Sequence, residues 1–372
     1  MTNTSTSTST STSTSTSTST STNLAVTAAE TADRDLVVRL AFGSMAAQTL
    51  RAAARLRVVE LVGDAPRRAV EVAADAGAEP QPMERLLRAL TGLGLLREPA
   101  PGTFSVTSAG ALLHPGRPDS LASFVRMFTE PTIVRAWEHL DDSVRTGEVA
   151  FDGVFGTDFF SHLAQHPELS AEFNAAMGQA SSETAAALPH AFDFGRFTSV
   201  TDVGGGDGTL LAGVLAAHPG LTGVVLDTAE GLAGTPDTMA RHGLEDRCSL
   251  IAGDFFHSVP GGSDLYLMKS VLHDWTDDQV VTILSHCRQV LPPGGLVLIV
   301  EPVLPDAVDV RADVTDGGAT YLSDLNMLVN VGGRERTRED FTEVCRRAGL
   351  TLTAVTPLPE AAPFAMIEAV AD

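Results

Sequence analysis

The second half of the chain alternates between short apolar runs and amphipathic stretches of helical length. The apolar runs predict strands over Ser199–Val203, Gly223–Leu226, Ser249–Ala252, Asp264–Lys269 and Leu296–Val300. Between them, stretches such as Thr209–Ala217 and Asp277–Leu291 carry apolar residues at helical spacing. Strands joined by helices in this way are typical of a doubly wound, mainly parallel sheet, so we expect an α/β domain here.

The first part of the chain has mostly helical spacing. One or two amphipathic helices are predicted between about Asp35 and Val62, and two further helical segments lie on either side of Pro80 and Pro82. The alternating segment Thr103–Thr107 then predicts a small β-wing. Helix, turn, helix and wing together give a winged-helix outline.

Residues 120–194 also predict helices throughout, and they are rich in aromatic and Met side chains for a chain with 5% aromatic residues. Side chains of this kind at helical spacing usually form a core. A pocket for a flat apolar ligand would be built from the same residues. Both interpretations stay open at this point.

The composition argues against several classes of partner. The 372-residue chain has a formal net charge of −22, whereas binding to nucleic acid needs a basic face. The three cysteines show no CxxC spacing, so we expect no metal site and no disulfide scaffold. No membrane span or signal peptide is recognisable, which makes a cytoplasmic location the expectation. The tract Thr4–Thr22 alternates strictly between Thr and Ser and is predicted to be disordered.

A glycine-rich loop, TDVGGGDGT, follows the first predicted strand. Gly204, Gly206 and Gly208 let the backbone turn tightly and lie close to a ligand, and Asp227 follows at the distance at which a carboxylate reaches ribose hydroxyls. A dinucleotide fingerprint would need Gly or Ala where this chain has Thr209, and no P-loop Lys follows. The loop therefore favours a nucleoside cofactor without phosphates.

The other polar candidates also follow predicted strands. Asp254 comes after the third strand, Lys269 and His273 after the fourth, and Glu301 at the end of the fifth. Ligands of doubly wound sheets bind at the carboxyl ends of the strands. We therefore expect these side chains to meet around one site.

Six motifs, in this order, resemble one enzyme family: DVGGGDG, LDTAE, GDFF, LHDWTDDQ, LPPGGLVLIVEPVLP and GGRERT. They are similar to the S-adenosylmethionine-dependent O-methyltransferases of the plant caffeic-acid and bacterial polyketide-antibiotic type, and the similarity runs from about Asp35 to Asp372. The resemblance implies a Rossmann-like, doubly wound methyltransferase domain preceded by a mainly α-helical winged-helix dimerisation domain, and a homodimer formed through that N-terminal domain. The implied division is a disordered tail (1–23), the dimerisation domain (24–118), a helical substrate-cap and linker region (119–194) and the methyltransferase domain (195–372).

The resemblance also assigns a cofactor site for S-adenosyl-L-methionine. The glycine loop would pass the methionine part, Asp227 would bind the ribose, and Asp254 would bind the adenine; the place of Asp254 after the third strand favours this role over the alternative that it simply caps a turn. The full implied set is Asp202, Gly204, Gly205, Gly206, Asp227, Asp254, Phe255, Lys269 and Trp275.

On the acceptor side, His273 matches the catalytic base of the family, and Glu301 and Glu335 match the acidic residues that orient it. A phenol with a pKa near 10 is a poor nucleophile at neutral pH, so a histidine with a pKa of about 6.5 suits the task. The implied substrate-binding residues are Phe124, Trp137, Phe160, Phe173, Met177, Asp274, Asn326 and Met327. They favour a flat aromatic polyketide or similar phenol over a sugar or a protein.

Three functions therefore stay open. The first is an O-methyltransferase that acts on a phenolic hydroxyl of an aromatic secondary metabolite. The second is a relative that keeps the cofactor but catalyses hydroxylation, decarboxylation or cyclisation, which loss of the base would favour. The third is a winged-helix DNA-binding regulator, which the near-neutral charge of residues 67–117 disfavours.

Overall fold

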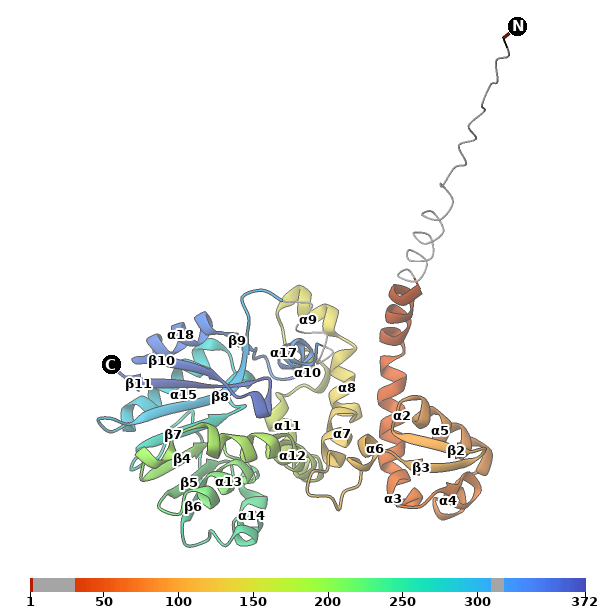
Figure 1. Cartoon of the computed structure of the whole chain (residues 1–372). Helices are drawn as coiled ribbons and strands as arrows, with labels where there is room; N and C mark the ends of the chain where they lie inside the picture. Colours follow the sequence, from red (N-terminus) through yellow and green to blue (C-terminus); the bar gives the residue numbers. More distant parts are fainter. Residues whose placement is uncertain (3–30, 309–317) are drawn as a thin grey trace.

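The computed structural model describes residues 1–2, 31–308 and 318–372. In Figure 1 a helical N-terminal domain and an α/β domain lie on either side of a set of connecting helices. The tract Thr4–Thr22, predicted to be disordered, lies outside the described residues.

The N-terminal domain has the predicted winged-helix outline. Residues 31–41 are helical, and the further elements are α2 (Gly43–Arg55), α3 (Val58–Val62), β1 (Arg67–Arg68), α4 (Ala69–Asp75), α5 (Pro80–Gly92), β2 (Leu96–Ala100), β3 (Thr103–Val106) and α6 (Ser108–Ala111). Strands β2 and β3 pair antiparallel as the wing, with Leu96 opposite Val106. Leu87, Leu90 and Phe104 are fully buried between wing and helices, so the apolar periodicity of α5 gives the core of this domain.

The connecting region is helical in the described structure, as the periodicity predicts. Its helices are α7 (Ala122–Phe128), α8 (Pro131–Trp137), α9 (Leu140–Thr146), α10 (Ala150–Phe155), α11 (Phe159–Gln165) and the long α12 (Pro167–Ala191). Pro131 and Pro167 occupy first-turn positions, where a missing N–H costs no helical hydrogen bond.

All five predicted strands are present in the α/β domain. They are β4 (Ser199–Val203), β5 (Thr222–Asp227), β6 (Cys248–Ala252), β7 (Leu265–Lys269) and β8 (Leu296–Leu304), and they pair in parallel in the order β8-β7-β4-β5-β6. The helices and the short strand around them are α13 (Thr209–Ala217), α14 (Thr235–His242), α15 (Asp277–Val290), α17 (Ala319–Asn330), β9 (Arg336–Thr337) and α18 (Arg338–Arg347). The chain runs outward from β4 to β6 and returns on the other side of β4 at β7. Ligands of such sheets bind at this reversal, above the ends of β4 and β7.

Two features differ from the sequence prediction. Two C-terminal strands, β10 (Leu350–Pro357) and β11 (Phe364–Ala371), extend the sheet with β11 antiparallel to β8, so the sheet is mixed. Strand β8 also continues to Leu304, which places Glu301 inside the strand rather than at its end. The pairing of β8 with β11 and β9 holds this longer stretch extended.

Both faces of the sheet are buried, which explains why its strands are almost continuously apolar. Leu265 and Leu267 face a core shared with α13, whereas Tyr266 and Met268 face a core shared with α15 and α18. With both faces covered, the strand ends are left to carry polar chemistry.

Candidate active site

The glycine loop after β4 has the close backbone approach that its sequence predicts. Gly204 and Gly206 have φ values of +74° and +55°, a region that side chains other than glycine rarely adopt. A Cβ at Gly204 would lie 2.7 Å from Val271 Cγ2, while the space beside Gly206 is open. The loop is therefore packed on the His273 segment at one point and accessible at another.

Asp227 fastens this loop from the end of β5. Its Oδ2 accepts from Gly206 N–H at 2.8 Å and its Oδ1 from Thr228 N–H at 2.7 Å. Burial raises the pKa of Asp227, and these backbone donors counteract the rise. Each oxygen keeps acceptor capacity that a ribose hydroxyl can use.

Asp254 caps a turn in this structure. Its Oδ1 accepts from Phe256 N–H at 2.8 Å, and its Oδ2 lies 2.7 Å from His257 Nδ1. Phe255, by contrast, places a ring carbon 3.7 Å from the Cβ position of Gly204. Phe255 is thus brought to the glycine loop, while the Asp254 carboxylate is engaged with its own turn.

His273 lies in a short 3-10 turn, Leu272–Asp274, directly after β7. The turn begins at Ser270, a non-glycine residue with φ of +54°. Strained backbone of this kind persists where the surroundings fix it. Here Glu301 does so, because its buried Oε1 accepts the backbone N–H groups of Val271, Leu272 and His273 at 3.1, 2.6 and 3.3 Å. Glu301 therefore holds the main chain of the turn rather than the imidazole.

The imidazole is held by Glu335. His273 Nδ1 lies 3.0 Å from Glu335 Oε1, which also accepts from the Ser323 hydroxyl of α17 at 3.1 Å. The Glu335 side chain is 0% exposed and that of His273 is 13% exposed. A carboxylate at Nδ1 fixes the proton there and leaves Nε2 as the free nitrogen. Nε2 in turn lies 3.7 Å from Asp274 Oδ1.

The carboxylates around His273 shift its pKa strongly. Burial alone lowers the pKa of His273, but Asp274, Glu335 and Glu301 together raise it to about 9. Burial raises the pKa of Asp274 to about 7, although His273 opposes that rise. With a pKa of about 9, the imidazole in this arrangement is protonated at neutral pH.

Lys269 and Asp202 form a second charged group beneath the loop. Burial lowers the pKa of Lys269 to about 8, and burial raises the pKa of Asp202 to about 7. Lys269 Nζ donates to Ser181 of α12 at 3.2 Å and lies 4.7 Å from the centre of the Phe364 ring. Lys269 thus links the sheet to the helical region.

The structure brings several predicted acceptor residues together. Phe160 stacks on Trp275 with ring centres 5.2 Å apart, and Phe160, Phe173, Met177 and Trp137 pack against one apolar cluster. Asn326 of α17 accepts from Trp137 Nε1 at 3.1 Å, and Met327 beside it is buried. Phe124 packs instead on Phe128. Trp275, which the sequence assigns to the cofactor, is therefore in direct contact with an acceptor residue.

Three residues around His273 are absent from the set predicted from sequence: Arg336, Gly333 and Ser323. The Arg336 side chain is 0% exposed, and its guanidinium donates to the carbonyls of Leu272 and Trp275 at 2.8 Å each and to Asp277. A Cβ at Gly333 would lie 2.0 Å from the His273 carbonyl oxygen. The GGRERT motif is a signal for Gly333 and Arg336, because a buried arginine needs several acceptors and paired glycines allow close packing, whereas Ser323 lies outside that motif.

The described residues contain seven buried polar side-chain atoms without a hydrogen-bond partner, and five of them belong to this site: Asp202 Oδ2, Trp275 Nε1, Glu301 Oε2, Asn330 Oδ1 and Glu335 Oε2. Buried polar atoms are rarely left unpaired in folded proteins. A polar ligand would satisfy them, so the atoms present fit a cofactor and an acceptor with several hydrogen-bonding groups. The same described residues contain no group of three or more side chains that could hold a metal ion.

Two family models match the chain. An O-methyltransferase dimerisation domain matches residues 38–116, and an O-methyltransferase domain matches residues 137–351, more than half of the chain. The chain belongs to the O-methyltransferase family. This O-methyltransferase is 44% identical to the O-demethylpuromycin-O-methyltransferase of Streptomyces alboniger, over 92% of this chain and 90% of that relative.

Solved O-methyltransferase structures have the same fold. The mitomycin 7-O-methyltransferase matches with a TM-score of 0.84 at 35% identity, covering 93% of this chain and 100% of that chain. An O-methyltransferase from neocarzinostatin biosynthesis, solved with S-adenosylmethionine and 2-hydroxy-5-methyl naphthoic acid, matches with a TM-score of 0.72 at 31% identity, covering 88% of this chain and 96% of that chain. The predicted fold class, enzyme class and cofactor, S-adenosylmethionine, are confirmed.

No helix among the described residues of this O-methyltransferase is both long enough and apolar enough to cross a membrane.

Proposed function

We propose that this O-methyltransferase methylates a phenolic hydroxyl of an aromatic secondary metabolite, with His273 as the general base. One observation carries the proposal: Glu335 engages Nδ1 of His273 and leaves Nε2 directed away from that pair. A base needs one free nitrogen in a fixed position, and proton transfer then requires the phenol oxygen within about 3 Å of it.

S-adenosylmethionine supplies the methyl group and the sulfonium leaving group when bound. The protein residues have to orient the acceptor in line and remove its proton. We propose that Gly204–Gly206 and Asp227 hold the cofactor, with Phe255 and Trp275 flanking its adenine. The adenine role of Asp254 stays a prediction, because its carboxylate caps a turn here.

The carboxylates around His273 favour proton transfer to its imidazole. Only neutral imidazole accepts a proton, and the surrounding carboxylates stabilise the charged form that results from transfer. Asp274 lies 3.7 Å from Nε2, so an incoming phenol has to share this space with its carboxylate. Glu335 and Glu301 then act as positioning residues, one for the imidazole and one for the turn.

The aromatic residues support the substrate class. Phe160 and Trp275 present stacked rings beside the His273 turn, and flat substrates bind to such surfaces. The relatives also support it, since one is named for O-demethylpuromycin and another was solved with a naphthoic acid. The aromatic acceptor is therefore proposed to lie against Phe160 and the α17 residues.

A methyl-transfer assay with and without the base tests the proposal. The protein is incubated with labelled S-adenosylmethionine and a panel of naphthols, and label is expected in a phenol ether. His273→Ala should lower turnover by about a hundredfold or more while cofactor affinity, measured by calorimetry, stays within about twofold.

Two results would count against it. A loss below about tenfold would mean that proximity carries the reaction without a base. Cofactor binding by the wild-type protein without label in any phenol would favour the non-methylating alternative. His242→Ala is the matched control, because His242 is an exposed residue at the last position of α14.

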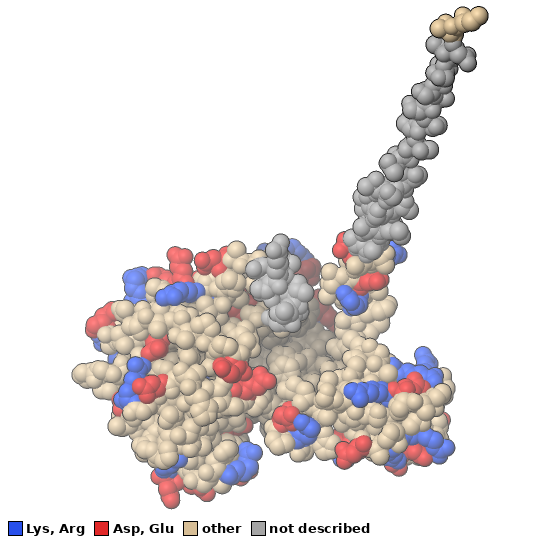
Figure 2. All heavy atoms as spheres, in the orientation of Figure 1, with Lys and Arg blue, Asp and Glu red and all other residues tan. Residues whose placement is uncertain are grey.

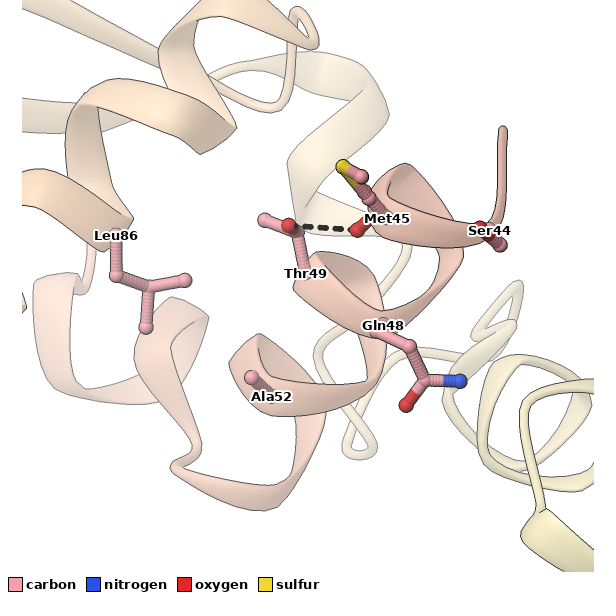
Figure 3. Close-up of a pocket in the computed structure, with 6 residues that line it drawn as sticks. All are labelled: Ser44, Met45, Gln48, Thr49, Ala52 and Leu86. Carbon is pink, nitrogen blue, oxygen red and sulfur yellow. Dashed lines mark hydrogen bonds between the residues drawn. The ribbon is translucent and has the colours of Figure 1, made fainter. Parts of the chain in front are cut away.

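We also propose that the active form is a homodimer built through the N-terminal domain. The segment from its first helical stretch to the first turn of α2 exposes six apolar side chains: Leu36, Val37, Val38, Leu40, Phe42 and Met45. Beside it, α2 and α5 border a hollow of about 420 Å³ lined by Ser44, Met45, Gln48, Thr49, Ala52 and Leu86, shown in Figure 3. Exposed apolar side chains in this number are typical of a protein interface, and the dimerisation-domain match supports a second copy as the partner.

The N-terminal domain is not proposed to bind nucleic acid. On the face shown in Figure 2, blue and red residues alternate over this domain without a basic stripe. The cytoplasmic location stays a prediction from the sequence.

A further inference from the structure

Asn326 lies on the face of α17 that meets the catalytic residues. Ser323 precedes it by three residues and donates to Glu335, whose same oxygen pairs with His273 Nδ1. Residues three apart on a helix are neighbours on one face, about 4.5 Å apart along the axis. Asn326 is thus one step along the helix from the group that holds the base.

Trp137 fixes the direction of the Asn326 amide. Its indole N–H reaches across from α8 and lies 3.1 Å from Oδ1 of Asn326. An indole nitrogen only donates, so the atom that it meets has to be the amide oxygen and not the amide nitrogen. Asn330 Nδ2 donates to the same oxygen at 2.9 Å. Flipping the Asn326 amide would set two N–H groups against each other, so this orientation is locked.

The surroundings keep Trp137 in place for this task. Its ring packs against the apolar cluster of the helical region, which includes the buried Ile133, Ala136 and Phe159. The donor that orients Asn326 is therefore anchored by the apolar packing of the helical region, to which Val329 of α17 also belongs. Trp137 is a positioning residue, since it acts through Asn326.

The amide nitrogen of Asn326 remains available to donate hydrogen bonds. Within the described residues Nδ2 makes no hydrogen bond, and it is not among the buried atoms without partners, so it is accessible. An amide nitrogen carries two N–H donors and accepts nothing. The acceptor side of the site thus presents a fixed donor one helical step from the His273–Glu335 pair.

We propose that Asn326 is a specificity-determining residue that selects aromatic substrates bearing a hydrogen-bond acceptor away from the methylated hydroxyl. A carbonyl, an ether oxygen or an aromatic ring nitrogen fits Nδ2, whereas an amino group at that position leaves two donors facing each other. This inference rests on the proposed O-methylation and specifies its substrate class.

A set of matched naphthols tests the inference. Each ring position is substituted in turn with methoxy, ethyl or amino, and methyl transfer is followed with labelled S-adenosylmethionine. Binding is measured in parallel by calorimetry with S-adenosylhomocysteine present. At the responsive position the wild-type enzyme should bind and turn over the methoxy compound about three- to tenfold better than the ethyl compound, and the amino compound worst.

Two variants separate this role from simple packing. Asn326→Asp keeps the shape and the oxygen that Trp137 and Asn330 contact but replaces the donor by an acceptor, so the order of the methoxy and amino compounds should invert. Trp137→Phe keeps an aromatic ring but frees the amide to turn, so the preference should fall towards unity. Asn174→Asp is the control, because Asn174 donates to the Glu230 carbonyl outside this group, and the wild-type order should remain.

The outcomes are distinct. If Asn326→Asp keeps the methoxy preference of the wild type, or if the wild type prefers the amino compounds, the inference is overturned. If the wild type binds S-adenosylhomocysteine but methylates no naphthol, the proposed function fails instead.

Discussion

Replacing Asp274 by Asn should shift the pH dependence of catalysis by a measurable amount. The carboxylates around His273, Asp274 foremost, raise its pKa to about 9, so at pH 7.5 only about 3% of the free enzyme carries a neutral imidazole. Because the base has to be neutral, kcat/KM of the wild type should rise with pH up to about 9. The pH dependence of kcat/KM reports the ionisation of groups in the free enzyme.

The distance between the two side chains gives the size of the shift. Two unit charges 3.7 Å apart interact by about 1 to 4 kcal/mol for effective dielectric constants between those of water and a protein surface. That corresponds to about one to three pH units. In Asp274→Asn the rise in kcat/KM should therefore occur between about pH 6 and 8.

Folding stability provides a second readout with a defined sign. His273 has a folded-state pKa of about 9, above the value of about 6.5 expected when it is unfolded. Its contribution to stability is therefore fully present below about pH 6.5 and is lost as the pH rises through 9. The melting temperature of the wild type should fall over this window, and that of Asp274→Asn should fall less.

A matched control and two possible results decide whether Asp274 sets the pKa of His273. Asp278→Asn removes a carboxylate that is 89% exposed and pairs with Arg347, so the wild-type profile should be retained. An unchanged profile in Asp274→Asn would show that Asp274 does not set the His273 pKa. A wild-type rate that is flat from pH 6 to 10 would refute the need for neutral His273 altogether.

Two further predictions concern Arg336, which supports the His273 turn, and the dimer. Arg336→Lys should lower kcat by about tenfold or more with little change in the KM for the cofactor, because lysine cannot bridge the Leu272 and Trp275 carbonyls. Arg334→Lys, on the partly exposed side of the same ion-pair group, should stay near wild type in steady-state assays, and equal losses in both variants would contradict a specific role of Arg336. Phe42→Asp, at a side chain 57% exposed, should convert the dimer to monomers in sedimentation experiments, and a wild type that sediments only as a monomer would remove the proposed interface.

The strands and their functional ends could be predicted from sequence because both faces of the sheet are buried. Continuous apolar runs such as Leu265–Lys269 are then visible without any tertiary information, and the residue after each run lies at the ligand edge. Strands β10 and β11 were missed, although they also contain apolar residues. Their place depends on antiparallel pairing with β8, a non-local contact that local periodicity does not encode.

The roles within the site were less predictable than its members. His273, Glu301 and Glu335 do lie together. Whether a carboxylate accepts hydrogen bonds from the imidazole or from the main chain depends on where each strand ends. Since β8 runs on to Leu304, Glu301 faces the N–H groups of the His273 turn from inside the strand. Glu335 comes from the far segment before β9 and reaches Nδ1 instead. Sequence spacing cannot distinguish these two arrangements.

The neighbouring positions of Glu335 and Arg336 explain how one short segment can control the base. Glu335 binds the imidazole, and Arg336 binds the carbonyls of Leu272 and Trp275 on either side of it. Glu301 satisfies the N–H groups of the same turn from below, so main chain and side chain are both fixed. Of the two ring nitrogens, only Nε2 is then left without a fixed hydrogen bond, and among the described residues Asp274 is the acidic side chain that lies within 4 Å of it. Reactivity at this atom should therefore depend on the ionisation of Asp274 more than on any motion of His273.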